Sequence, residues 1–262
     1  MAPKQCFDNR NNVNQTLLRG LSALEILAEA DDEMGVRDLS RRLGLGPPMA
    51  QRILNTLLSR GFVEQNTKTR KYSIGHQTFV VGRKYVTENG LIETALSVLR
   101  KVVDETQLNA YVGELANGYA VYLLVLQSRG PIAVRATPGE RASLHSTAMG
   151  KALLAAMDRA EIVRLIKANP LTAKTPKTIT KLPALLSDLE LVRSRGFAIS
   201  DEENLPGVFA AGAGIRDALG RTTAAISFAC PTAQADESTC AIICAQAKRA
   251  AMQISMRLGA VR

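Results

Sequence analysis

Residues 145–150, with the sequence HSTAMG, are the part of the chain best suited to bind a small anion. A turn rich in hydroxyl groups leads into a helical pattern, and the first amides of a helix attract a carboxylate or phosphate. Thr147 can donate a hydroxyl hydrogen bond, and the small residues Ala148 and Gly150 let a ligand approach the backbone. An ordinary capped helix is the alternative. Nucleotide hydrolysis is rejected, because His145 stands where a phosphate-binding loop needs glycine.

Three adjacent acids, Asp201, Glu202 and Glu203, are the second group with possible chemistry. Two of them could act as a general acid and a general base. Three consecutive acids before a loop are more typical of a turn, or of polar groups that orient a ligand. We therefore expect no catalytic residue here.

Histidines and cysteines give no metal or catalytic pattern. His76 and His145 are the only histidines, and we expect His145 to be structural rather than a base for a neighbouring serine. Nine and three residues separate Cys230, Cys240 and Cys244, which does not match the paired ligands of a zinc site. We expect no metal and no cofactor. We expect Cys240 and Cys244 to share a helix face and to be buried, with a thiol sensor as the alternative.

The positive charge is concentrated in one segment. The chain has 262 residues and a net charge of +9, and residues 34–84 contain ten basic residues against two acidic ones. Such asymmetry is typical of a DNA-binding module, with a solvated basic surface as the alternative. Aromatic residues make up only 4% and Trp is absent, which argues against single-strand binding by base stacking. Double-stranded DNA and small anions remain as partners.

The basic segment has the pattern of a winged helix-turn-helix. Apolar spacing predicts helices over residues 13–30, 36–43 and about 47–60, with Asn14 as an N-cap and Gly61 ending the third helix. Two short strands, over 62–65 and 70–74, flank a polar basic turn and predict a hairpin. In this geometry the third helix enters the major groove and the hairpin, the wing, follows the backbone.

Seven polar or basic residues of this module are candidate DNA contacts. We expect the residues of the third helix to reach base edges or phosphates, and those of the wing to contact phosphates. The alternative for Arg52 is a cap or an ion pair within the domain. The candidates are Arg41, Gln51, Arg52, Asn55, Lys68, Arg70 and Lys71.

At this point the chain resembles the IclR family of transcriptional regulators. Residues 39–65, LSRRLGLGPPMAQRILNTLLSRGFVEQ, and the following RKYSIG resemble the family's DNA-binding domain. LHSTAMGKALLA at 144–155, RGFAISDEE at 195–203 and AAISFACP at 224–231 match three motifs of its second domain in the right order, so the resemblance covers about residues 13–258. Pro48 and Met49 replace the family's usual Ser-Thr pair, so a hydroxyl cap is missing from the recognition helix.

The resemblance implies a GAF-like effector-binding domain and a homodimer or homotetramer, a dimer of dimers, on DNA. Thr147, Ala148 and Met149 would line the pocket, Ser200 and Asp201 would face them, and a floor would complete it. Alanines replace more polar residues on that floor, which favours a ligand with an apolar body and an acidic group, such as an aromatic or short aliphatic acid. The floor residues are Ala210, Ser227 and Ala229.

The expected fold class is α+β, with a winged helix-turn-helix joined by a linker helix to a GAF-like domain. The expected boundaries are a flexible tail over 1–12, the DNA-binding domain over 13–78, the linker helix over 79–90 and the effector domain over 91–262. Apolar runs predict six strands in one sheet, with helices on its faces. The strands are expected over 109–113, 121–127, 132–136, 197–200, 208–215 and 222–228.

The expected function is a cytoplasmic, ligand-responsive regulator that binds a palindromic operator as a dimer. No secretory signal and no apolar run long enough to span a membrane is found in the sequence. Relief of repression and gain of activation are both open. Two other readings remain: an acyl or amide enzyme built on the second domain, and an architectural DNA-binding protein with a ligand-free dimerisation domain.

Overall fold

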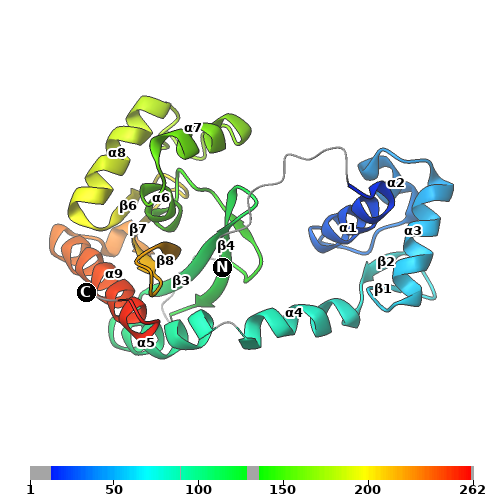
Figure 1. Cartoon of the computed structure of the whole chain (residues 1–262), viewed down its shortest axis with the longest axis horizontal. Coiled ribbons are helices and arrows are strands. Elements are labelled where there is room, and N and C mark those ends of the chain that lie inside the picture. The colour runs from blue at the N-terminus through cyan, green and yellow to red at the C-terminus, as the bar shows by residue number, and fades with distance from the viewer. Residues whose placement is uncertain (1–12, 89, 129–135, 261–262) are drawn as a thin grey trace. The chain divides into compact units, whose positions relative to one another are not determined.

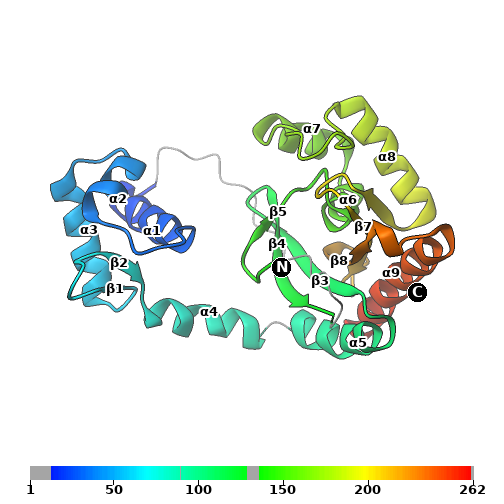
Figure 2. The same cartoon turned by 180° about the vertical axis from the view of Figure 1, so that it is seen from behind.

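The computed structural model describes residues 13–88, 90–128 and 136–260, which divide into two compact units between residues 88 and 89. Among these residues, every buried hydrophobic cluster is built within one unit. Figures 1 and 2 show the elements of each unit from opposite sides. The expected tail lies outside the described residues, and so does the expected strand over 132–136 apart from Ala136. No described helix is long and apolar enough to cross a membrane.

The first unit has the predicted order of three helices and a hairpin. Its helices are α1 (Gln15–Ala28), α2 (Val36–Leu43) and α3 (Pro47–Ser59), and its strands are β1 (Val63–Gln65) and β2 (Tyr72–Ile74). The Asn14 side chain accepts the amides of Thr16 and Leu17, each at 3.0 Å, which confirms the predicted N-cap. Gly61 follows α3 with a φ of +71°, a conformation that glycine adopts without strain, and this confirms the predicted end of the helix.

One hydrophobic core holds these elements together. Apolar residues of α1, α2 and α3 pack against the hairpin, where Tyr72 is only 2% exposed. Met34 and Tyr72 also form a backbone bridge, which ties the turn before α2 to β2. The wing is therefore joined to the helices by packing and by hydrogen bonds. Helix α4 (His76–Glu88) follows β2 and spans most of the range expected for the linker helix.

The second unit is built on a six-stranded antiparallel sheet, which confirms the predicted α+β class. The strand order is β5-β4-β3-β8-β7-β6. The edge strand β5 is the short segment Arg141–Ala142, which the sequence analysis did not predict. The strands are β3 (Asn109–Ala116), β4 (Tyr119–Leu126), β5 (Arg141–Ala142), β6 (Ala198–Asp201), β7 (Val208–Arg216) and β8 (Thr222–Pro231).

Helices cover both faces of this sheet. On one face, α5 (Gly90–Thr106) and α9 (Glu237–Arg257) pack over apolar residues of β3, β7 and β8, as Figure 1 shows. On the other face lie α6 (Ala148–Ala155), α7 (Arg159–Ala168) and α8 (Leu182–Arg195). Strand residues alternate between the two faces, so neighbouring residues of one strand point to opposite sides of the sheet. The face under α6 carries the candidate effector residues.

Candidate functional site

The third helix of the first unit presents the predicted base readers. The Gln51 side-chain amide donates to Asn55 Oδ1 at 2.8 Å and to the Tyr72 hydroxyl at 2.9 Å. Arg52 is exposed, and its side chain forms no hydrogen bond or ion pair with a described residue. The described residues therefore do not support the alternative that Arg52 forms a cap or an ion pair within the domain. Its guanidinium is left available for a phosphate or a base edge.

The amino end of α3 lacks a side-chain cap, as the sequence analysis predicted. Gly46 is the N-cap, and prolines occupy the first turn. Arg41, on α2, pairs with Asp38 at 2.7 Å, and both side chains are largely exposed. Such a pair contributes little to stability, so Arg41 can exchange Asp38 for a phosphate at small cost.

The wing holds its three basic candidates on an ordered turn. Lys68, Arg70 and Lys71 are all exposed, and Arg70 has a φ of +59°. Asn66 accepts the backbone amides of Lys68 and Thr69, at 2.9 and 3.2 Å. The structure thus presents the three side chains on one short, internally bonded turn, which suits contacts to neighbouring phosphates.

Glu33 anchors this turn and was not singled out from the sequence. Its carboxylate accepts Asn66 Nδ2 at 2.8 Å and Thr69 Oγ1 at 2.9 Å. These hydrogen bonds, with Lys71 nearby, lower the pKa of Glu33. The sequence placed Glu33 only in an acidic cluster, because its partners lie more than thirty residues away along the chain.

In the second unit, the amino end of α6 is buried and capped by Thr147. Its hydroxyl accepts the Gly150 amide at 3.0 Å and donates to the Ser143 carbonyl at 2.5 Å. The expectation that Thr147 donates to a ligand therefore needs correction, because its one hydroxyl proton is already used. Thr147 shapes the site as the cap of the helix.

The next two amides of α6 are the available donors. Ala148 and Met149 are each 1% exposed, and their backbone N–H groups have no acceptor among the described residues. A buried amide without an acceptor is costly, so such amides bind water or a ligand. The helix dipole adds positive potential at the same place. This arrangement suits a carboxylate.

The sheet brings four predicted site residues together under α6. Ser200 pairs with Ala210, and Ala210 pairs with Ala229, so these three lie in one row across β6, β7 and β8. Ser227 lies two residues from Ala229 on the same face. A Cβ added at Gly212, in the row next to Ala210, would lie 2.9 Å from backbone of Ala148, which shows how closely α6 approaches.

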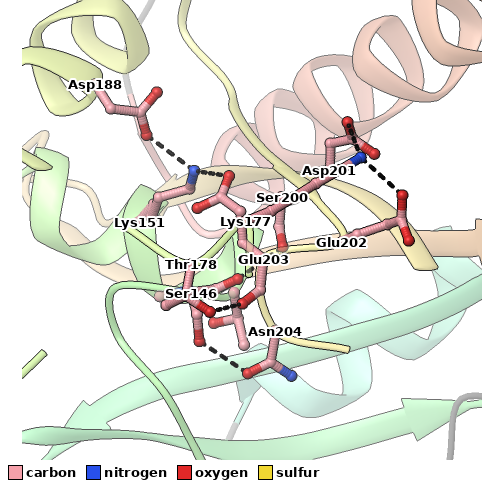
Figure 3. A network of polar contacts seen from close by, with 12 residues as sticks. Ser146, Lys151, Lys177, Thr178, Asp188, Ser200, Asp201, Glu202, Glu203 and Asn204 are labelled. Atoms are coloured by element: carbon pink, nitrogen blue, oxygen red, sulfur yellow. Dashed lines mark hydrogen bonds and ion pairs between the residues drawn. The ribbon is translucent and has the colours of Figure 1, made fainter. Parts of the chain in front are cut away.

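Asp201 lies elsewhere, contrary to the expectation that it faces the amino end of α6. Its side chain is about half exposed and pairs with Lys177 at 3.1 Å, as Figure 3 shows. The physical reason is strand alternation: Ser200 and Asp201 are neighbours on β6 and point to opposite sides. Only Ser200 faces α6, where its hydroxyl donates to the Ser146 carbonyl at 2.7 Å.

Two tyrosines and an asparagine of this face were missed. Asn109 pairs with Ala229, and Tyr111 pairs with Ser227, which extends both rows onto β3. The Tyr111 and Tyr122 rings lie 5.6 Å apart, and burial raises both pKa values, that of Tyr122 to about 12. Both rings are therefore neutral near pH 7 and can pack against an apolar ligand body.

The remaining acids support the turn interpretation of residues 201–203. Glu202 has a φ of +56° and accepts the Gly207 amide at 2.8 Å and Lys177 Nζ at 2.7 Å. These hydrogen bonds lower the pKa of Glu202. Glu203 is mostly buried against Lys151, a residue of the 144–155 motif that was given no role. Each of the three acids thus pairs with a lysine.

His145 and the cysteines have structural surroundings. His145 is 6% exposed, with its ring nitrogens bonded to Ser143 Oγ at 3.1 Å and the Thr172 carbonyl at 3.0 Å; burial lowers its pKa. Ser146 donates instead to Asn204 Oδ1 at 2.9 Å, so the two do not form a catalytic pair.

Burial raises the pKa of all three described thiols, and Cys240 is only partly buried rather than buried as expected. Less thiolate at neutral pH means lower reactivity, which disfavours a thiol sensor. The described residues contain no group of His, Cys, Asp and Glu that could hold a metal ion.

Comparison with known families gives two matches that together span most of the chain. Residues 16–67 match the IclR helix-turn-helix domain, and residues 83–256 match the C-terminal domain of bacterial IclR transcriptional regulators. The HTH-type transcriptional regulator BhcR of Paracoccus denitrificans is 31% identical over 83% of this chain and 78% of its own length.

Solved structures share the fold. An IclR transcriptional regulator from Alicyclobacillus acidocaldarius is 22% identical, with a TM-score of 0.84 over 94% of this chain and 100% of its own. An IclR homologue from Microbacterium hydrocarbonoxydans, solved in complex with 4-hydroxybenzoate, is also 22% identical, with a TM-score of 0.80 over 93% of this chain and 98% of its own. At 22% sequence identity, the similarity to these two structures supports a shared fold and nothing more.

Proposed function

This chain belongs to the IclR family of bacterial transcriptional regulators, and on that premise we propose that it binds a palindromic operator and responds to a small organic acid with an aromatic body. The family assignment makes it a DNA-binding regulator with an effector-binding C-terminal domain, not an enzyme. The proposal concerns what that domain binds and which residues make the contacts.

The observation that carries the proposal is the pair of buried amides at the amino end of α6. The backbone N–H groups of Ala148 and Met149 have no acceptor among the described residues, and the helix dipole favours an anion beside them. The floor under α6 is made of small residues, since Ala210 pairs with Ala229 across β7 and β8. A carboxylate at the amides with its apolar body over these alanines matches both features.

Two further facts favour an aromatic body. Tyr111 and Tyr122 lie close together on the same side of the sheet as the alanines, and neutral rings of this kind pack edge to face against other rings. The homologue from Microbacterium hydrocarbonoxydans was solved with 4-hydroxybenzoate, an aromatic acid. We propose Thr147, Ala148, Met149, Ser200, Ala210, Ser227 and Ala229 as effector-site residues.

The DNA-binding surface consists, in this proposal, of the exposed side of α3 together with the wing. Gln51, Arg52 and Asn55 read base edges or phosphates, and the basic residues around them neutralise the backbone. These are Arg41, Lys68, Arg70 and Lys71.

A palindromic operator requires two recognition helices, and exposed apolar residues support assembly as a homodimer or a dimer of dimers. Leu17 is 62% exposed on α1, and Phe79 is 71% exposed on α4, each with further apolar neighbours on its own helix. Exposed apolar patches of this kind are typical of contacts between protein chains. Light scattering of the purified protein tests this: a monomer at micromolar concentration would contradict it.

The deciding experiment compares acids with their neutral amides. Benzoate and 4-hydroxybenzoate should raise the melting temperature, since at a hundred times its Kd a ligand stabilises the native state by about 2.7 kcal/mol. Benzamide and 4-hydroxybenzamide have the same rings without the charge and should not. Each acid that binds is then added to a titration of the protein with its own upstream DNA. Equal binding of acids and amides, or no effect on DNA affinity, would contradict the proposal.

A further inference from the structure

The loop after β6, residues 202–207, is tied to α6 by side chains of both elements. Ser146, two residues before α6, donates from its hydroxyl to Asn204 Oδ1 at 2.9 Å. Lys151, one turn further along α6, donates from Nζ to Glu203 Oε1 at 2.6 Å. Figure 3 shows both contacts reaching the same short stretch of loop. The amide nitrogen of Asn204 has no acceptor among the described residues, so it can donate to a ligand.

Lys151 is the centre of a buried ion triad. Its side chain is 1% exposed, and Nζ lies 2.9 Å from Asp188 Oδ2 on α8 and 2.6 Å from Glu203 Oε1. The two carboxylates are 20% and 12% exposed, and the second oxygen of Glu203 is buried without a hydrogen-bond partner among the described residues. Lys151 thus connects α6, α8 and the loop at one point.

Stability alone does not account for such a triad. Removing three charged groups from water is costly, and apolar side chains of similar volume commonly serve as well or better. What an ion triad adds is a fixed geometry, because the amine reaches both carboxylates only when the loop and α8 hold one position. The feature that the geometry fixes here is the placement of Asn204 beside the amino end of α6.

We propose that Lys151 is a positioning residue of the effector site, which holds Glu203, and through it Asn204, at the amino end of α6. This rests on the proposed function of that helix end. Asn204 then supplies a third hydrogen-bond donor beside the amides of Ala148 and Met149, and the carboxylate of the effector receives donors from two elements.

A second lysine, Lys177 in the segment between α7 and α8, contacts the same loop and provides a matched control. Lys177 pairs with Asp201 at 3.1 Å and with Glu202 at 2.7 Å, but its side chain is 51% exposed. Water screens these contacts, so they constrain the loop weakly. Lys177→Met removes a lysine from the loop's surroundings without disturbing the buried triad.

The test is hydrogen–deuterium exchange of the full-length protein, read by mass spectrometry without any effector. The main variant combines Lys151→Met, Asp188→Asn and Glu203→Gln, which keeps side-chain volume and leaves no buried charge unpaired. We expect exchange over residues 202–208 to accelerate at least tenfold, while β7 and β8 stay protected. Lys177→Met should show less than a twofold change. Unchanged exchange at 202–208 would overturn the proposal, and so would acceleration across the whole unit, which indicates a general structural role.

A second measurement separates this proposal from the proposed function. Binding of 4-hydroxybenzoate by calorimetry should weaken at least tenfold in the triple variant and in Asn204→Ala, and remain unchanged in Lys177→Met. If the natural protein binds no aromatic acid, the proposed ligand class fails, whereas the exchange experiment still decides whether Lys151 positions the loop. Normal acid affinity in the triple variant would overturn the role of Lys151 even if the loop exchanged faster.

Discussion

The side-chain amide of Gln51 donates a hydrogen bond to the hydroxyl of Tyr72, 2.9 Å away, and thereby joins the recognition helix to the wing. The same amide also donates to Asn55, one turn along α3. Two candidate base readers are thus held in a fixed relation to each other and to β2. Because Tyr72 is almost fully buried, its ring cannot move without disturbing the core of the first unit.

Tyr72→Phe removes this link and keeps the packed ring. We expect the loss of one hydrogen bond to lower the free energy of unfolding by about 0.5–1.5 kcal/mol. Affinity for operator DNA should fall several-fold, because Gln51 and Asn55 lose their link to β2 and keep only the hydrogen bond to each other. Tyr119→Phe, at a 37% exposed tyrosine of the other unit, is the control. Unchanged operator affinity in Tyr72→Phe would show that the link does not serve recognition.

Arg52→Ala distinguishes base reading from phosphate contact. If Arg52 reads a base, its loss should cost about 1–3 kcal/mol on the preferred operator and relax the preference at one position. Binding to a panel of single-base operator variants measures this. A loss of equal size on every sequence would make Arg52 a phosphate contact instead.

Lys68→Ala and Lys71→Ala probe the wing. Each should reduce the slope of log K against log salt by about one, because one counterion fewer is released on binding. Titrations at four or more salt concentrations give the slope. A slope that stays at its original value in both variants removes the wing from the interface.

Thr147 tests the amino end of α6. Thr147→Val deletes the hydroxyl that caps Gly150, and loss of an N-cap costs about 0.5–2 kcal/mol. Acid binding should weaken as well, since the neighbouring amides lose their fixed orientation. Thr147→Ser retains the cap and should behave like the natural protein. Denaturant unfolding and calorimetry provide the two readings; full acid affinity in Thr147→Val would remove the cap from the site.

We expect substitution by alanine to have opposite effects on stability at two helical glycines. A Cβ at Gly150 would lie 2.5 Å from the Leu144 Cα and from the Ser143 carbonyl oxygen, so Gly150→Ala should destabilise the second unit by about 1–3 kcal/mol. At Gly82, in α4, the added Cβ would meet no described atom within 4 Å apart from its chain neighbours and the backbone of its own helix. Gly82→Ala should stabilise its helix by up to about 1 kcal/mol. Melting curves decide, and equal effects at the two sites would contradict this account.

His145 gives a pH dependence of stability with a defined sign. Burial lowers its pKa below the ordinary 6.5, so the native ring stays neutral while the unfolded ring takes up a proton. Its contribution to stability is present above pH 6.5 and is lost as the pH falls through the lowered value. Urea unfolding at pH 7.5 and 5.5 should show less loss on acidification for His145→Gln than for the natural protein.

Glu203 has the opposite effect on the pH dependence of stability. Burial raises its pKa above 4.5, so on acidification the folded state takes up this proton before the unfolded state does. Glu203→Gln should therefore show a larger loss of stability than the natural protein between neutral pH and about pH 5. A loss equal to that of the natural protein would mean that Glu203 does not titrate in this range.

The sequence predicted most elements, because their signals are local. Asn14 caps α1 and Gly61 follows α3 as expected, since a cap or a left-handed residue depends on its immediate neighbours. The edge strand Arg141–Ala142 was missed because two residues carry no period and depend on pairing with β4. The motif at 144–155 located the amino end of α6, whose position in the chain is also local.

The contacts of the site could not be predicted in the same way. Lys151 pairs with Asp188 and Glu203, which lie 37 and 52 residues further along the chain. No periodic sequence pattern predicts a pair between residues so far apart in the chain. Asp201 was placed in the site with Ser200, although alternation along a strand sends neighbours to opposite faces. Tyr111 was overlooked because its face depends on the register between β3 and β8, which is a property of the folded sheet.

The separate cores of the two units have a consequence for how regulators of this kind can diversify. Since the packing of α1, α2 and α3 with the hairpin uses no described residue of the second unit, recombination between genes can exchange one head for another without creating voids or clashes in either core. An inherited sensor can thus be redirected to new promoters in one step, and a laboratory chimera made at the same boundary should keep its ligand while changing its target.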